Sequence, residues 1–167
     1  MQKNTEALLE FTRQLGTSMG TQQQAELLRA VGDSDDPLAL QLLLPYLLDP
    51  VPSIAKVARQ SAERLLLKIP SEMLSWVEQE TRKRSRKGSV TADRNAPLRR
   101  WQLLTPGTLS GLGREPEAFS ILALASFHDS GFVREAAVRM LDAFHQGREL
   151  PYLLLRANDW VAVVQQE

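Results

Sequence analysis

The chain has 167 residues, no formal net charge and an apolar fraction of 43%, the values of an ordinary soluble globular domain. It contains no cysteine, which excludes disulfides, thiolate metal sites and cysteine nucleophiles. Neither a secretory leader pattern nor an apolar run long enough to cross a bilayer is present. We therefore expect a cytoplasmic protein that does not bind membranes.

Charge is unevenly distributed along the chain although it sums to zero. Residues 70–114 carry 9 basic and 4 acidic side chains, whereas residues 115–167 carry 4 basic and 8 acidic ones. The middle of the chain therefore predicts a local basic surface rather than a field around the whole molecule.

The first half of the chain has the apolar spacing of helices. Residues 8–15 and 25–32 predict two short helices, each of which ends at a glycine. Residues 38–48 predict a third helix, kinked at Pro45. Residues 54–69 predict a fourth, whose apolar residues form a single stripe.

The second half is less regular. Residues 73–77 predict a helix that runs into a basic stretch, and residues 97–104 predict a short one. Residues 105–114 hold three glycines and one proline, which predict a loop. Residues 116–127 and 133–144 predict a helical pair, and residues 149–167 predict a truncated pair with its turn at Asn158-Asp159.

Two phrases recur in the sequence. Residues 44–48 and 150–154 both read Leu-Pro-Tyr-Leu-Leu. An aspartate that leads through a short turn into a helical pattern occurs at Asp49, Asp129 and Asp159. Such self-similarity indicates a repeat architecture, in which each helical pair packs against its neighbours.

The segment that runs from Asp129 through Val133, Arg134, Ala136 and Ala137 to Leu141 resembles the second helix of HEAT repeats. The chain is similar to bacterial HEAT-repeat proteins, a label shared with phycobilisome-lyase-like repeats. The resemblance implies an all-α, right-handed α-solenoid that forms one domain over residues 1–167. Its repeats would span about residues 4–32, 37–69, 70–106 and 116–146, with a truncated one at 149–167. It also implies a structural ladder between repeats, made by Asp49, Asp129, Arg134 and Asp159.

No residues point to catalysis, to a cofactor or to a metal. His128 and His145 are the only histidines, and neither belongs to a pattern with metal-ligand spacing. The glycine-rich residues 107–113 lack the lysine and the preceding strand of a phosphate loop. We therefore expect a protein that is not an enzyme, with structural roles for both histidines.

Repeat arrays present wide, shallow surfaces, which favour binding over catalysis. We expect a protein-interaction scaffold that binds an unidentified protein through the concave face formed by the second helices. The candidate contacts are the polar residues of those helices: Lys56, Arg59, Gln60, Glu63, Glu135, Arg139 and Asp142.

A basic cluster supports an alternative, in which the chain binds the backbone of a nucleic acid. The cluster is flanked by Trp76 and Trp101, whose rings could stack on bases or cations. A solvated basic loop or a site for an acidic protein would explain the same charges. A tetrapyrrole-holding chaperone is a further alternative, suggested only by the family resemblance. The cluster comprises Arg82, Lys83, Arg84, Arg86, Lys87, Arg94, Arg99 and Arg100.

The last segment, Trp160 to Val164, is apolar on several sides. The end unit of a repeat array exposes the face that a further unit would cover. We expect that the native protein continues with more repeats, so that these 167 residues form an N-terminal fragment of a longer array. The alternative is that this edge is buried in a dimer or against a partner, and in the isolated chain it should promote self-association.

Overall fold

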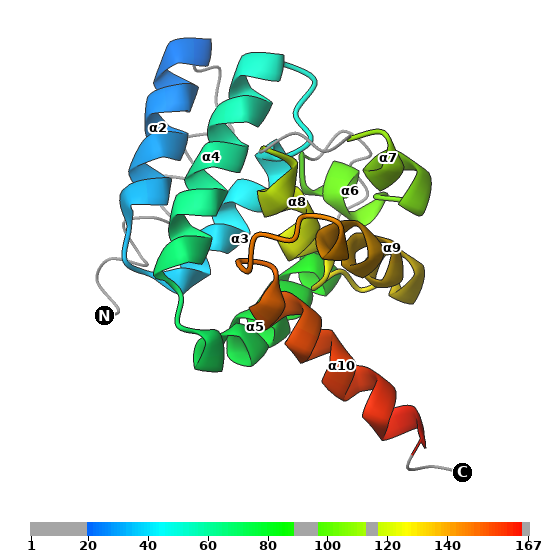
Figure 1. Cartoon of the computed structure of the whole chain (residues 1–167). Helices are drawn as coiled ribbons and strands as arrows, with labels where there is room; N and C mark the ends of the chain where they lie inside the picture. The colour runs from blue at the N-terminus through cyan, green and yellow to red at the C-terminus, as the bar shows by residue number, and fades with distance from the viewer. Residues whose placement is uncertain (1–19, 89–96, 113–116, 165–167) are drawn as a thin grey trace.

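The structure is a computed structural model, and it describes residues 20–88, 97–112 and 117–164. For residues 158–164, and for several residues near the end of α5, only the backbone is described. Within these ranges all regular elements are helical and no strand is present (Figure 1), which confirms the all-α prediction. The predicted helix at residues 8–15 lies outside the described part of the chain.

The elements follow one another with short connections. The α-helices are α2 (Thr21–Asp33), α3 (Leu40–Leu43), α4 (Pro52–Lys68), α5 (Leu74–Gly88), α6 (Pro97–Gln102), α7 (Pro106–Ser110), α8 (Ala118–Ala125), α9 (Gly131–Asp142) and α10 (Leu150–Val164). Three short 3-10 helices join them: η1 (Pro37–Ala39), η2 (Leu44–Tyr46) and η3 (Ser71–Met73).

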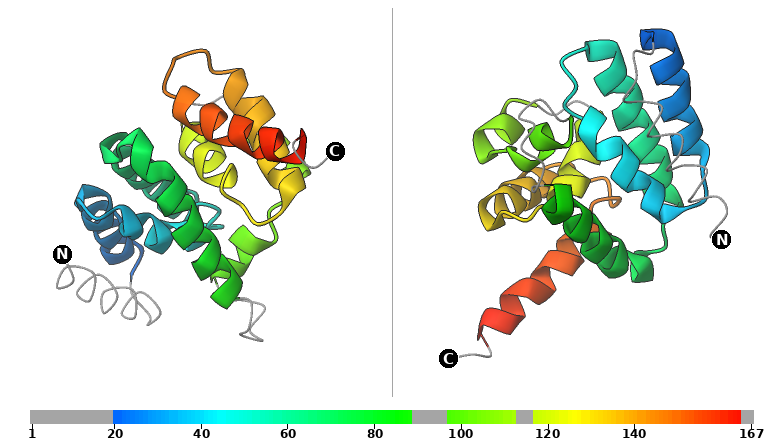
Figure 2. Two further views of the ribbon diagram at one scale, coloured as in Figure 1. Left: turned by 90° about the horizontal axis from the view of Figure 1, so that it is seen from below. Right: turned by 180° about the vertical axis from the view of Figure 1, so that it is seen from behind.

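Helices α2 and α4 lie side by side and run in the same direction (Figures 1 and 2). The apolar stripe predicted for α4 is buried, with Ile54, Ala58 and Leu65 at most 1% exposed. Small residues at the contact allow a close approach of the two backbones. An added Cβ at Gly32 of α2 would lie 2.6 Å from the Cβ of Ser61 in α4. The contact therefore requires glycine at position 32.

Gly32→Ala should destabilise the protein by about 1–3 kcal/mol, because the methyl group would force α2 away from α4. Gly131→Ala is the matched control, since the nearest atom to its added Cβ lies 3.8 Å away. Urea denaturation of both variants measures the difference. Similar midpoints for the two variants would mean that the two helices do not pack this closely in solution.

The segment predicted as one kinked helix over residues 38–48 is instead divided into η1, α3 and η2. Pro45 lies within η2. A proline removes one backbone hydrogen bond and clashes with the preceding turn of an α-helix. The prediction of a kinked continuous helix was therefore wrong, although most of the segment is buried as expected, including Leu40, Leu43 and Leu47.

Residues 105–114 were predicted as a loop, but α7 occupies residues 106–110. Thr105 caps this helix, because its hydroxyl accepts a hydrogen bond from the backbone N–H of Thr108 at 3.2 Å. Pro106 occupies the first helical turn, where a proline has no backbone bond to lose. The cap and the proline therefore start a helix although the glycines of this segment favoured a loop. Leu109 of α7 is fully buried.

Helices α8 and α9 form the predicted pair around residues 126–130. Every residue of α8 is buried, as expected for a helix that is apolar all round and lies in a core. The apolar stripe predicted for α9 is also confirmed. Its residues Val133, Ala137 and Leu141 are buried in the core.

Helix α10 is continuous from Leu150 to Val164, so the predicted turn at Asn158-Asp159 was wrong. Its first half packs against α9 and α5. Its second half extends away from the rest of the protein (Figures 1 and 2). The final unit is therefore a single projecting helix rather than a truncated helical pair.

Candidate functional site

The polar residues predicted to contact a partner from α4 are largely engaged within the chain. Arg59 donates from Nε to the carbonyl oxygen of Leu47 at 3.0 Å. Lys56 Nζ lies 3.7 Å from the carboxylate of Glu117. Glu63 forms an ion pair with Arg148, and both side chains are about three-quarters buried. The ion pairs of Lys56 and Glu63 join α4 to the segments before α8 and α10, whereas Arg59 bonds to the segment before α4.

The remaining predicted contacts are more accessible. On α9, Arg139 and Glu135 pair with each other at 2.6 Å, as charges four residues apart on a helix commonly do. Gln60 and Asp142 are exposed. The predicted concave surface is therefore polar, and Arg59 and Glu63 of its α4 part are engaged within the chain.

The basic cluster is divided by the structure. Helix α5 continues to Gly88, so residues 82–87 are helical rather than a loop. Arg82 pairs with Glu78 and donates to the carbonyl oxygen of Phe127 at 3.2 Å. Lys83 pairs with Glu80 at 2.6 Å. The side chains of Arg84, Arg86 and Lys87, and all of Arg94, lie outside the described part of the chain.

The second part of the cluster is also engaged. Arg100 donates to the carboxylate of Asp49 at 3.2 Å, and Arg99 is half-buried in α6. Trp101 is only 1% exposed, so its ring cannot serve as the stacking platform that the sequence suggested. Trp76 is 41% exposed. Three described cations of the cluster, Arg82, Lys83 and Arg100, thus pair with acidic groups of the same chain.

The residues of the predicted inter-repeat ladder have other contacts in the described part of the chain. Asp49 accepts a hydrogen bond from the N–H of Val51 at 2.9 Å and joins its turn to α6 through Arg100. Arg134 donates to the carbonyl oxygens of His128 and Asp129 at 2.8 and 2.9 Å, and these contacts close the turn of its own helical pair. The side chain of Asp159 is not described.

His128 has a structural role. It is 4% exposed, and its Nε2 lies 3.0 Å from the carbonyl oxygen of Trp101. Its Nδ1 accepts a hydrogen bond from the N–H of Ser130 at 3.0 Å, so the neutral ring carries its proton on Nε2. Burial lowers the pKa of His128, because desolvation disfavours the charged imidazolium.

This arrangement makes stability depend on pH. Below about pH 6.5 the unfolded chain binds a proton at His128 that the folded chain resists. The free energy of unfolding should therefore fall as the pH decreases from about 7 toward 5. His128→Gln, which lacks this titration, should show a smaller decrease over the same range in parallel urea titrations. Identical pH profiles would contradict the buried neutral ring.

A buried charge network joins α5 to α10. Glu78 of α5 is 7% exposed and pairs with both Arg82 and Arg156. Arg156 of α10 is 4% exposed. This network was not predicted from the sequence, although an arginine that follows three leucines in an apolar helix is a signal of a buried, paired side chain.

Several large apolar side chains of the described residues are exposed, among them Phe132, Leu103 and two leucines at the start of α10. Leu150 and Leu154 are 53% and 66% exposed, and they lie one helical turn apart on the same face. Leu67 at the end of α4 is 69% exposed. We call these three residues the leucine surface. No described helix has the length and apolar character needed to span a membrane.

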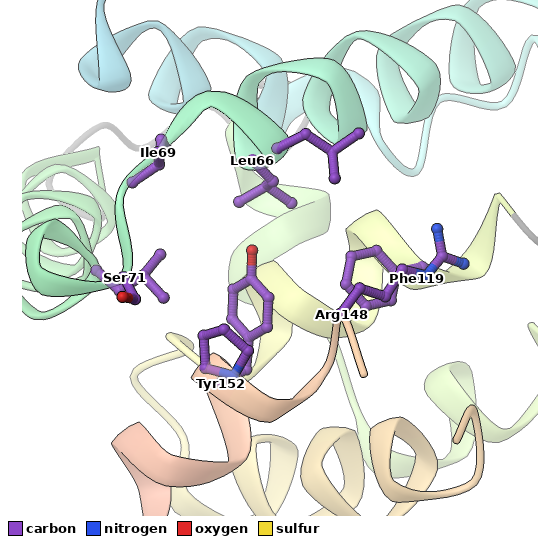
Figure 3. Close-up of a pocket in the computed structure, with 9 residues that line it drawn as sticks. Leu66, Ile69, Ser71, Phe119, Arg148 and Tyr152 are labelled. Carbon is purple, nitrogen blue, oxygen red and sulfur yellow. The ribbon is translucent and has the colours of Figure 1, made fainter. Parts of the chain in front are cut away.

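A pocket of about 200 Å³ lies beside the leucine surface (Figure 3). Leu67 forms part of its wall, and so does Pro151, which follows Leu150. The ring of Tyr152 stands inside the pocket, with Ser71 on one side and Phe119 and Arg148 on the other. The other lining residues are Leu66, Ile69 and Leu74.

Aromatic packing fixes one wall of the pocket. The Tyr152 ring lies 5.9 Å from the rings of both Phe119 and Phe127. The guanidinium of Arg148 lies 4.1 Å from the centre of the Phe119 ring, a favourable cation–π distance. This contact holds Arg148 against α8, and the ion pair with Glu63 offsets its charge.

Comparisons of the chain with models of protein families, with curated proteins and with solved structures found no match. The resemblance to HEAT repeats therefore rests on the sequence pattern alone.

Proposed function

We propose that this chain is a non-catalytic protein-interaction module, built as an α-solenoid of HEAT-like helical pairs, that binds an amphipathic helix of a partner protein. The observation that carries the proposal is the leucine surface: Leu150 and Leu154 share one face of α10, and Leu67 of α4 lines the same pocket as Pro151. Grouped exposed apolar side chains commonly mark interaction sites, whereas single ones are ordinary.

Two features support the solenoid. Helices α2 and α4 run in the same direction side by side, as second helices of consecutive repeats do. Helices α8 and α9 form a pair joined by a short turn. The array is not strictly regular, because two short helices, α6 and α7, follow α5 where a repeat would have one longer second helix.

The shape of α10 favours a helical partner. Leu150, Leu154 and Ala157 are exposed residues at positions i, i+4 and i+7, the spacing of one helix face. In the sequence, Val161 and Val164 continue the same spacing by steps of four and three. Because α10 extends from the protein (Figure 1), a partner helix could lie along this face without meeting other elements.

The nucleic-acid alternative has less support, because the described arginines and lysines of the basic cluster largely pair with acidic groups. It also makes a distinct prediction. Nucleic-acid affinity should fall steeply between roughly 50 and 200 mM salt, whereas burial of leucine side chains is much less sensitive to salt.

Site-directed photo-cross-linking tests the proposal. A photoreactive residue is placed at Leu154, and matched probes are placed at the exposed Gln60 and Asp142. Exposure of each variant to an extract of the native cell should give a heterologous protein adduct at position 154 in strong excess over the other two. Adducts confined to positions 60 and 142 would favour the polar surface instead. A nuclease-sensitive adduct, or one made only of a second copy of this chain, would overturn the proposal.

A further inference from the structure

Helix α10 is held against the protein by two buried side chains that lie one helical turn apart. The ring of Tyr152 lies 5.9 Å from the rings of both Phe119 and Phe127. One turn later, Arg156 pairs with Glu78 of α5. Tyr152 and Arg156 are each 4% exposed, so the two side chains anchor the helix to different parts of the core.

The part of α10 beyond Arg156 has little support of its own. Among the residues whose side chains the structure describes, Arg156 is the last buried one of α10, and Ala157 is exposed. The helix then extends away from the protein to Val164 (Figures 1 and 2). So short a segment is not a stable helix alone in water, because the first turn is costly to form. The projecting half therefore depends on the docked half for its helical state and its direction.

The two anchors also determine which face of α10 is exposed. Successive residues of an α-helix are rotated by about 100°, so Leu154 lies about 200° from both Tyr152 and Arg156. Leu150, Leu154 and Ala157 are accordingly exposed on the opposite side. Hydrophobicity alone does not favour this arrangement, because it directs an arginine inward and two leucines outward. Such a local violation is expected where a surface has a function.

Glu78 is the group that keeps the arginine inside. It is 7% exposed and also pairs with Arg82. A buried ion pair adds little net stability, but it requires one specific partner and is costly to break, so it can select one arrangement of two elements. An apolar contact would accept several orientations of α10, whereas this carboxylate accepts the one that brings Arg156 to it.

We propose that Glu78 and Arg156 are positioning residues for the leucine surface: their ion pair fixes the direction and the rotation of α10, so that Leu150 and Leu154 face outward on a preformed helix. This role rests on the function proposed above, in which a partner helix lies along that face. A preformed face lowers the ordering cost of binding. Both positioning residues are buried, so they act without touching the partner.

Arg156→Met separates positioning from general packing. It removes the charge, keeps an unbranched side chain of good helix propensity, and leaves Glu78 paired with Arg82. Because the chain contains no cysteine, spin labels can be attached through Gln60→Cys on α4 and Ala157→Cys on α10, at two exposed positions. Double electron–electron resonance on the purified chain then measures the distance between the two labels.

The labelled chain with Arg156 intact should give one narrow distance peak. Arg156→Met should lose this peak and give a broad distribution, although its circular dichroism spectrum stays that of a folded helical protein. Arg156→Lys keeps the charge and should retain the peak. The same narrow peak in Arg156→Met, a broad distribution with Arg156 intact, or equal broadening in Arg156→Lys would overturn the proposal.

The measurement needs no partner protein, so the two proposals can fail separately. Unchanged distances in Arg156→Met would remove the positioning role and leave the leucine surface as a binding site. Absence of a cross-linked protein at Leu154 would overturn the function proposed above without altering these distances.

Discussion

Glu78→Gln is expected to lower the free energy of unfolding by about 3–5 kcal/mol, because it removes the carboxylate shared by two arginines in a buried network. Arg156 is 4% exposed, and the side chain of Arg82 is about three-quarters buried. Neither guanidinium can recover full hydration when the carboxylate is lost. Urea denaturation followed by circular dichroism measures the change.

Glu80→Gln is the control for this prediction. Glu80 lies on the same helix and pairs with Lys83, whose side chain is 62% exposed. Loss of such a surface pair should cost less than about 1 kcal/mol. If the two variants unfold at the same urea concentration, Glu78 is solvated in the native protein and α10 is not held to α5 by this network.

The second large effect is expected in the apolar core. Leu65→Ala and Leu141→Ala should each destabilise the protein by about 2–5 kcal/mol, through lost burial and the cavity left behind. Leu65 is 1% exposed and Leu141 is fully buried. Leu67→Ala on the same helix as Leu65, and Arg139→Ala on the same helix as Leu141, are the matched controls.

The controls should have small effects, because the side chain of Arg139 is 76% exposed and Leu67 is 69% exposed. Melting temperatures measured by differential scanning calorimetry compare the four variants. Equal shifts for Leu65→Ala and Leu67→Ala would show that α4 presents a different face to the core.

Sequence periodicity predicted the long amphipathic helices well. In α4 and α9 the apolar residues recur at three- and four-residue steps and face the core, as for Ile54, Leu65 and Leu141. Sequence periodicity failed where the same local signal, an aspartate, is compatible with both a turn and a helix. Asp159 resembled the turn aspartates at positions 49 and 129, yet its backbone lies within α10, because an aspartate is tolerated inside a helix that its neighbours favour.

The candidate site could not be predicted in the same way. Glu78 and Arg156 are 78 positions apart in the sequence, so no local pattern reports that they meet. Helix α10 has apolar residues on more than one face. Periodicity cannot show that Tyr152 is buried while Leu150 and Leu154 remain exposed, since that depends on where α5, α8 and α9 pack.

The affinity of the cross-linked partner for variants of α10 is the most direct test of the interaction proposal. The comparison uses Leu150→Ser with Leu154→Ser against Gln60→Ala with Asp142→Ala, measured by isothermal titration calorimetry on the purified proteins. The leucine variant should bind at least about tenfold more weakly, since loss of a central apolar contact at an interface commonly costs over 1.4 kcal/mol, and the polar variant should bind as the wild type does. Unchanged affinity for the leucine variant, with loss of binding in the polar variant, would contradict the account and move the interaction surface to the second helices.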